Sequence, residues 1–229
     1  MESYHRNLEK KLGVKFDNPQ LLLEAVTHRS YLNETSKKGL SSNERLEFLG
    51  DSILSFIISH WLFTLFPDYS EGILTNLRSN LVKTESLAKI AKKLSLGSFL
   101  LLSKGEKESG GKDNPVLLAN CLEAIMGAIF LDQGISAVKN FIQRNFKNLL
   151  ENLILRGEFK DFKSLLQEKT QKINKISPVY KTIKETGPDH AKIFTVGVFL
   201  GKKLLAKGKG KSKQLAEEQA AEYALQKLK

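Results

Sequence analysis

Residues 43–52 read Asn43-Glu44-Arg45-Leu46-Glu47-Phe48-Leu49-Gly50-Asp51-Ser52. Three carboxylates, those of Glu44, Glu47 and Asp51, stand at positions i, i+3 and i+7, which in an α-helix places them on one face within about 60° of each other. Leucine and isoleucine side chains surround them, so we expect this face to be half buried. Three like charges on such a face repel one another and lose hydration, which calls for a positive group nearby.

A further acidic residue stands in a more apolar setting. Glu123 is the only charged side chain in the 18 residues from Asn114 to Leu131. An ionised carboxylate there needs a cationic partner or a metal ion. Asn120, three residues earlier, offers an amide oxygen, and Glu71 could contribute a carboxylate from a second direction. Mg²⁺ prefers oxygen ligands, so the set together favours a shared magnesium site.

Each acidic residue also has a purely structural explanation. Glu44 has capping-box spacing from Ser41, and the charge of Glu71 favours the N-terminus of a helix. Asp51 and Glu123 would each form an ion pair with a buried arginine, either Arg45 or Arg78. For any single acidic residue the structural explanation is favoured, whereas for the set the metal site is favoured.

The first two thirds of the chain are predicted to be helical. One helix begins near Ser42 or Asn43 and stops at Pro67, because proline cannot continue a helix. Apolar spacing predicts further helices after Tyr69-Ser70, from Ser86 to Leu94, from Val116 to Leu131 and from Ile135 to Leu155. Residues 105–115 are predicted to form a polar loop, and no strand is predicted before residue 170.

The last third of the chain has a different pattern. A helix is predicted from Phe162 to Gln171, and another from Lys213 to Lys227. Between them, β-branched and aromatic residues predict three strands at 179–184, 194–199 and 203–206. We therefore predict an α+β protein, with an all-α domain over residues 1–157 and a small α-β-β-β-α domain over residues 158–229.

The charge of the chain is concentrated in this second unit. The 229 residues carry a net charge of +11, yet residues 1–158 hold 20 Lys and Arg against 18 Asp and Glu. Residues 159–229 hold 16 lysines, no arginine and only 7 acidic residues. A basic, solvated face is the plain alternative, but such a concentration of lysine favours contact with the phosphates of a nucleic acid without reading of its bases.

The sequence also predicts the compartment. Cys121 is the only cysteine, so no intramolecular disulfide can form, and a reducing compartment is expected. The N-terminus lacks an apolar signal core, and the apolar stretch Ile53–Phe66 is short for a bilayer and contains polar residues, so we interpret it as a buried helix. We expect a soluble, cytoplasmic protein with no membrane partner. His28, His60 and Cys121 lack zinc-ligand spacing and are interpreted as core or surface residues.

The ten residues 43–52 resemble the signature motif of bacterial ribonuclease III. Thr27-His28-Arg29-Ser30, Glu71-Gly72 and Leu118-Ala119-Asn120-Cys121-Leu122-Glu123-Ala124 resemble the other endonuclease motifs of that family, in the same order. Residues 161–229 resemble its double-stranded-RNA-binding domain, most clearly at Gly187-Pro188-Asp189-His190 and Gly208-Lys209-Gly210-Lys211-Ser212-Lys213. The resemblance covers nearly the whole chain.

This resemblance implies an endoribonuclease that cuts double-stranded RNA, including rRNA precursors and other structured transcripts. It implies Mg²⁺, for which Mn²⁺ can substitute, no small-molecule cofactor, and products with 5′-phosphate and 3′-hydroxyl ends and short 3′ overhangs. It implies a homodimer in which each protomer cuts one strand and Phe48 inserts into the partner. The implied metal ligands are Glu47, Asp51, Asn120 and Glu123, and the further implied catalytic residues are Glu44 and Glu71. Asn120 departs from the family, which usually has Asp there, so one negative charge is missing.

The second unit is expected to recognise the shape of duplex RNA across two minor grooves and the phosphates between them. The first helix of this unit carries Gln167, Glu168 and Gln171. Their amide and carboxylate groups can form hydrogen bonds with the 2′-hydroxyls of a minor groove. His190 is expected to enter the next minor groove. Phosphates are expected to meet Lys209, Lys211 and Lys213 at the start of the last helix, where the helix dipole helps. Gln214 stands where such domains often have another lysine.

Two other functions remain open from the sequence. The first is a double-stranded-RNA-binding protein that does not cut, suggested by Asn120. The second is a helical phosphohydrolase acting on nucleotides, which would leave the basic C-terminal unit unexplained. Staggered cuts in duplex RNA that need Mg²⁺ and Glu123 would distinguish the enzyme from both.

Overall fold

The computed structural model of the chain describes residues 2–35, 39–156, 162–188 and 192–228. The chain forms two compact units, residues 1–159 and 160–229, each described by itself below. The predicted boundary between residues 157 and 158 falls outside the described residues and stays a prediction.

The first unit is helical, as predicted. Its described elements are α1 (Glu2–Leu12), α2 (Pro19–Ala25), α3 (Arg29–Leu32), α4 (Glu44–Leu65), α5 (Glu71–Val82), α6 (Thr84–Lys93), α7 (Lys104–Glu108), α8 (Pro115–Arg156) and the 3₁₀ turns η1 (Leu96–Ser98) and η2 (Gly111–Asp113). Within the described part of this unit, the only β pairing is an isolated bridge between Thr27 and Leu101.

One region of this unit differs from the prediction, and one break in a helix agrees with it. Residues 105–115 are not a simple loop, because Ser103 caps α7 by accepting a hydrogen bond from the Glu106 amide at 3.2 Å, and η2 follows. The two helices predicted on either side of residue 133 are confirmed, because α8 is broken into two helical segments by a kink at Gly134, whose φ of 78° is not helical. Glycine adopts such a left-handed conformation at little cost, so the helix changes direction there.

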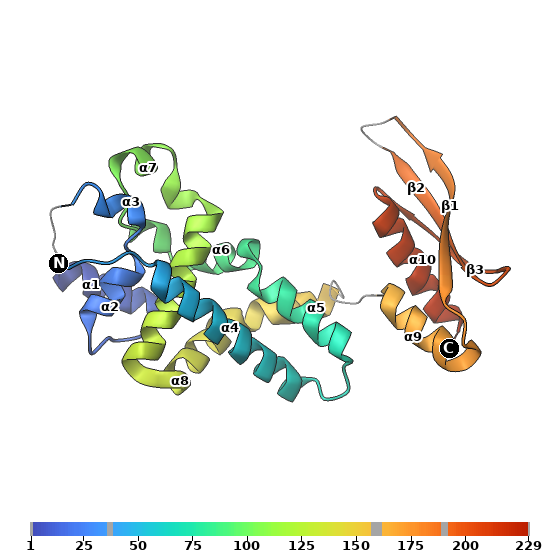
Figure 1. Ribbon diagram of the computed structural model, residues 1–229, viewed down its shortest axis with the longest axis horizontal. Helices are drawn as coiled ribbons and strands as arrows, with labels where there is room; N and C mark the ends of the chain where they lie inside the picture. Colours follow the sequence, from blue (N-terminus) through green and yellow to red (C-terminus); the bar gives the residue numbers. More distant parts are fainter. Residues whose placement is uncertain (1, 36–38, 157–161, 189–191, 229) are drawn as a thin grey trace. The chain divides into compact units, whose positions relative to one another are not determined.

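The core of the first unit lies between α4 and α8, which cross within the unit (Figure 1). Leu54, Ile58 and Leu62 line the buried side of α4. The stretch Ile53–Phe66 is not wholly buried, however, because Phe56 and Phe63 are 61% and 72% exposed. By length and composition alone, α4 and α8 could each span a membrane, a property that core helices of soluble proteins share.

The second unit has the predicted order of helix, three strands and helix. Its elements are α9 (Phe162–Asn174), β1 (Pro178–Thr186), β2 (Ile193–Leu200), β3 (Lys203–Gly210) and α10 (Lys213–Lys227). The antiparallel sheet has the order β1-β2-β3, with β1 and β3 at its edges (Figure 1). Val198 of β2 and its cross-strand neighbour Ala206 of β3 pack with Leu166 of α9 and Ala220 of α10, so both helices cover one face of the sheet.

Candidate active site and RNA-binding surface

Two glycines allow α4 and α8 to approach until their backbones touch. A Cβ atom built on Gly50 of α4 would lie 1.8 Å from the main-chain oxygen of Glu123 in α8. A Cβ atom on Gly127 of α8 would lie 2.3 Å from the main-chain oxygen of Leu46 in α4. Any other residue at either position would push the helices apart. This close crossing brings the acidic motif of α4 against Glu123.

The carboxylates at this crossing interact electrostatically. Burial first, and then the charges of Asp51 and Glu47, raise the pKa of Glu123 to about 7. Burial, together with the charges of Glu44 and Asp51, also raises the pKa of Glu47. A hydrogen bond from the side chain of Asn120 opposes part of that rise. The structure thus places Glu47, Asp51, Asn120 and Glu123 close enough to influence one another.

The arginine pairs considered from the sequence are not formed. In the part of the chain that the structure describes, no ion pair joins Asp51 or Glu123 to Arg45 or Arg78. Arg45 is exposed, so it was wrong to expect it in the core. Arg78 is half buried and donates a hydrogen bond to Ser59 Oγ at 3.0 Å. Among the described residues, no arginine is therefore paired with Asp51 or Glu123.

The donors at this crossing fit a hard cation in their chemistry, since all of them are carboxylate or amide oxygens. Raised carboxyl pKa values also show that positive charge would be favourable there. The side-chain positions do not themselves form a coordination sphere, because no group of three His, Cys, Asp or Glu among the described residues is arranged to hold a metal ion. Ligation would need changes in side-chain rotamers.

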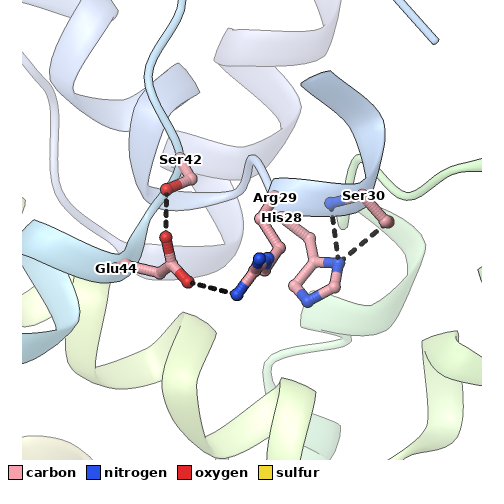
Figure 2. A network of polar contacts seen from close by, with 5 residues as sticks. All are labelled: His28, Arg29, Ser30, Ser42 and Glu44. Carbon is pink, nitrogen blue, oxygen red and sulfur yellow. Dashed lines mark hydrogen bonds and ion pairs between the residues drawn. The ribbon is translucent and has the colours of Figure 1, made fainter. Parts of the chain in front are cut away.

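Glu44 lies at the start of α4 and not in a capping box. Asn43 precedes the helix, and Glu44 is its first residue, so it cannot be the fourth position of a box that begins at Ser41. Its carboxylate accepts a hydrogen bond from Ser42 Oγ at 2.9 Å and lies 3.4 Å from Nη1 of Arg29, as Figure 2 shows. Sequence reasoning missed the contact with Arg29, which comes from α3.

Glu71 lies apart from the other acidic residues. It is the first residue of α5, where its carboxylate accepts a hydrogen bond from Thr75 at 2.8 Å. It lines a hollow of about 700 Å³ between α4 and α5, together with Phe56, Phe63 and Arg78. Since α4 rises about 1.5 Å per residue, this hollow begins more than about 10 Å along the helix from Glu47.

An aromatic stripe follows the exposed side of α4. Phe48, predicted to contact a partner, is 78% exposed, and Phe56 and Phe63 continue the stripe. Single exposed apolar residues are ordinary, but aligned aromatic residues beside a hollow mark an interaction surface. The sequence signal for Phe56 and Phe63 is their helical spacing from Phe48, which places all three on one side of α4.

The second unit exposes most of the residues predicted to bind RNA. The exposed set consists of Gln167, Glu168, Gln171, Lys209, Lys211 and Lys213. Gln171 donates a hydrogen bond to Ser177 Oγ at 3.2 Å. His190 lies outside the described residues, so its predicted contact stays untested. Ser212 caps α10 by accepting a hydrogen bond from the Leu215 amide at 3.2 Å, which leaves the positive end of the helix near Lys213.

Two carboxylates of this unit pair with its lysines and were not foreseen. Glu185 of β1 lies 3.4 Å from Lys213 and 3.6 Å from Lys192. Glu217 of α10 lies 2.6 Å from Lys163 of α9. The pairs Glu185–Lys213 and Lys163–Glu217 join residues far apart in the sequence, so only the folded arrangement reveals them.

Comparisons with known proteins identify the family of each unit. Residues 18–150 match the family model Ribonuclease-III-like, and residues 162–228 match the Double-stranded RNA binding motif. Ribonuclease 3 of Borreliella burgdorferi is 47% identical over 219 residues, which are 96% of this chain and 89% of the relative. Ribonuclease 3 of Carboxydothermus hydrogenoformans is 48% identical over 97% of this chain and 95% of the relative.

Solved structures match the first unit. The nuclease domain of ribonuclease III from Campylobacter jejuni is 43% identical, with a TM-score of 0.57, over 62% of this chain and 94% of that domain. A second structure of that domain, with a TM-score of 0.56 and 43% identity over 62% of this chain and 97% of that domain, is described as flexible in the region involved in dimer formation. With its helical unit, its acidic helix crossing and its C-terminal RNA-binding motif, the chain belongs to the ribonuclease III family of double-strand-specific endoribonucleases.

Proposed function

We propose that this protein is a Mg²⁺-dependent dimeric endoribonuclease that cuts both strands of duplex RNA, leaving 5′-phosphate and 3′-hydroxyl ends with short 3′ overhangs. The observation that carries the proposal is the α4–α8 crossing, where burial and the charge of Asp51 raise the pKa of Glu47 and of Glu123, and where no arginine among the described residues pairs with these three carboxylates. Mn²⁺, which shares the preference for oxygen ligands, is expected to substitute.

The residues of the crossing would hold the cation and the water. Glu47, Asp51 and Glu123 would supply carboxylate oxygens, and Asn120 would supply an amide oxygen in place of a fourth charge. When bound, Mg²⁺ supplies an activated water and offsets negative charge on the phosphate. The Asn120 amide, which also donates a hydrogen bond to Glu47, would fix the direction of that carboxylate. The backbone contact at Gly50 keeps the two helices from shifting.

The aromatic stripe of α4 would form the interface with a second copy. Phe48, Phe56 and Phe63 together expose an apolar surface whose burial would stabilise a dimer. The hollow beside the stripe could receive an aromatic side chain of the partner, and Glu71 at its edge would then lie against that partner. Size determination by light scattering checks this directly, because Phe48→Ala should shift the protein towards monomer, whereas a monomeric wild type would contradict it.

The second unit would hold the duplex by shape and charge. Its exposed lysines and the positive end of α10 suit the phosphates, and the exposed amides of α9 suit the 2′-hydroxyls of a minor groove. The absence of arginine from this unit favours recognition without base reading. Structured transcripts, including rRNA precursors, would be the substrates, and the cytoplasm is the compartment that the single buried Cys121 suits.

The central test uses end-labelled duplex RNA with and without Mg²⁺. Wild-type protein should produce staggered cuts only with Mg²⁺, and Glu123→Gln should bind the duplex with similar affinity but not cut it. Lys139→Ala, an exposed change elsewhere on α8, is the matched control and should cut like the wild type. Binding without cutting by the wild type would contradict the proposal and favour a non-cutting RNA-binding protein, a possibility raised by Asn120.

A further inference from the structure

The short segment before α3 is fastened to the start of α4. The main-chain oxygen of Thr27 accepts a hydrogen bond from the amide of Asn43 at 2.8 Å. On the other side, the amide of His28 donates to the oxygen of Leu101 at 3.0 Å, and the amide of Leu101 donates to the oxygen of Val26 at 2.9 Å. The backbone that carries Arg29 is therefore held from two directions, next to the first turn of α4.

The residues on either side of Arg29 are also fixed. His28 caps α3, since its Nδ1 accepts a hydrogen bond from the Ser30 amide at 3.3 Å and lies 2.8 Å from Ser30 Oγ, as Figure 2 shows. Ser30 Oγ in turn accepts a hydrogen bond from the Ser103 amide at 3.1 Å. Arg29 thus projects from a backbone with few alternative conformations.

Arg29 and Ser42 hold the two oxygens of one carboxylate. Nη1 of Arg29 lies 3.4 Å from Oε1 of Glu44, and Ser42 Oγ donates to Oε2 at 2.9 Å (Figure 2). The side chains of Arg29 and Glu44 are 74% and 55% exposed, so their ion pair adds little to stability. The ion pair instead fixes the orientation of the Glu44 carboxylate, because a carboxylate bound at both oxygens can adopt few rotamers.

We propose that Arg29 is a positioning residue of the nuclease site, acting on the reaction through the carboxylate of Glu44. The inference rests on the proposed function, together with the catalytic role that the family resemblance implies for Glu44. Arginine suits this task better than lysine, because its planar guanidinium fixes an orientation as well as a charge. Ser42 orients the other oxygen of the Glu44 carboxylate, so Ser42→Ala is a second, independent test.

The test is a double-mutant cycle on single-turnover cleavage of labelled duplex RNA with Mg²⁺. Arg29→Ala should slow cleavage about 10-fold through misplacement of the Glu44 carboxylate, with the affinity for RNA unchanged. Ser42→Ala should slow it less, and Arg29→Lys should recover part of the rate. In a Glu44→Gln background, Arg29→Ala should have no further effect, because the group through which it acts is already altered.

The controls separate this role from others. Lys139→Ala removes an exposed positive charge elsewhere and should leave the rate unchanged. The proposal would be overturned if the reductions in cleavage rate caused by Arg29→Ala and Glu44→Gln multiplied in the double variant. It would also be overturned if Arg29→Ala lowered the affinity for RNA and left the cleavage rate unchanged. Either result would show that Arg29 contacts the RNA itself. An unchanged rate in both Arg29→Ala and Ser42→Ala would also overturn the proposal. Failure of the wild type to cut would instead contradict the proposed function.

Discussion

Gly50 of α4 lies directly against the backbone of Glu123 in α8, with a Cβ position only 1.8 Å from the main-chain oxygen of Glu123. The residue that permits the closest helix contact thus lies next to Asp51, and the backbone it touches belongs to Glu123. The helix contact at Gly50 therefore determines how close the carboxylates of α4 lie to the carboxylate of Glu123.

Gly50→Ala should therefore damage both stability and activity. An added methyl group cannot be accommodated by a main-chain oxygen, so the helices must move apart, at a cost of about 3 kcal/mol in the free energy of unfolding. Urea denaturation measures that loss, and cleavage assays at a temperature where the variant is folded should show reduced cutting.

Gly105→Ala is the matched control for this change. Gly105 lies in α7, and outside the backbone of that helix no described atom lies within 4 Å of the position of an added Cβ. It should leave stability unchanged or raise it by about 0.5 kcal/mol, because alanine restricts the unfolded chain. Equal stability of the two variants would show that the close contact at Gly50 does not constrain the helices.

The sequence could predict the helices and the acidic face, because both depend on local periodicity. A helix alone places Glu47 and Asp51 on one face, and Glu123 is recognisable as the only charged residue of a long apolar segment. The ion pair of Arg29 with Glu44 could not be predicted, because it depends on how α3 lies against α4. The separate position of Glu71 likewise follows from the tertiary path of α5.

Stability should depend on pH through Glu123. Its pKa is raised to about 7 in the folded protein, so folding favours the protonated form. This contribution is fully present below about pH 4.5, the pKa of an unperturbed Glu, and is lost as pH rises towards about 7. With EDTA present, the Tm of the wild type should fall over that range more than the Tm of Glu123→Gln.

Mg²⁺ should reverse this loss at neutral and alkaline pH. A cation that binds only the folded protein raises its Tm, and the rise should be smaller in Glu123→Gln, which lacks one charged ligand. Identical pH profiles and identical Mg²⁺ shifts for the two proteins would argue against a carboxylate cluster that binds metal.

Asn120 should be tolerated, because three carboxylates remain at the crossing. Asn120→Asp removes the hydrogen bond donated to Glu47 and adds a like charge to a cluster whose carboxyl pKa values are already raised. It should therefore lower the Tm in EDTA and lower the Mg²⁺ concentration needed for half-maximal cutting. Titration of cleavage with Mg²⁺ measures this change. Cleavage by Asn120→Asp without any cleavage by the wild type would refute the tolerance of Asn120.

Removal of residues 159–229 should weaken RNA binding greatly but leave some cutting at low salt. The first unit has its own core and contains the acidic crossing, while nearly all of the surplus positive charge lies in the second unit. Affinity for duplex RNA measured at several salt concentrations should lose most of its salt dependence. An unchanged affinity and an unchanged slope would show that the second unit does not hold the duplex.

Lys213→Ala should weaken binding more than Lys211→Ala does. Lys213 lies at the positive end of α10 and pairs with Glu185 at 3.4 Å, so its loss removes a phosphate contact and leaves a carboxylate unneutralised beside the RNA. The slope of log affinity against log salt should fall by about 1 for each lysine, but the affinity at a fixed salt concentration should fall further for Lys213→Ala. Lys227→Ala, at the opposite end of α10, is the control and should bind like the wild type. Equal losses for Lys211→Ala and Lys213→Ala would show that Glu185 has no influence on the bound phosphate.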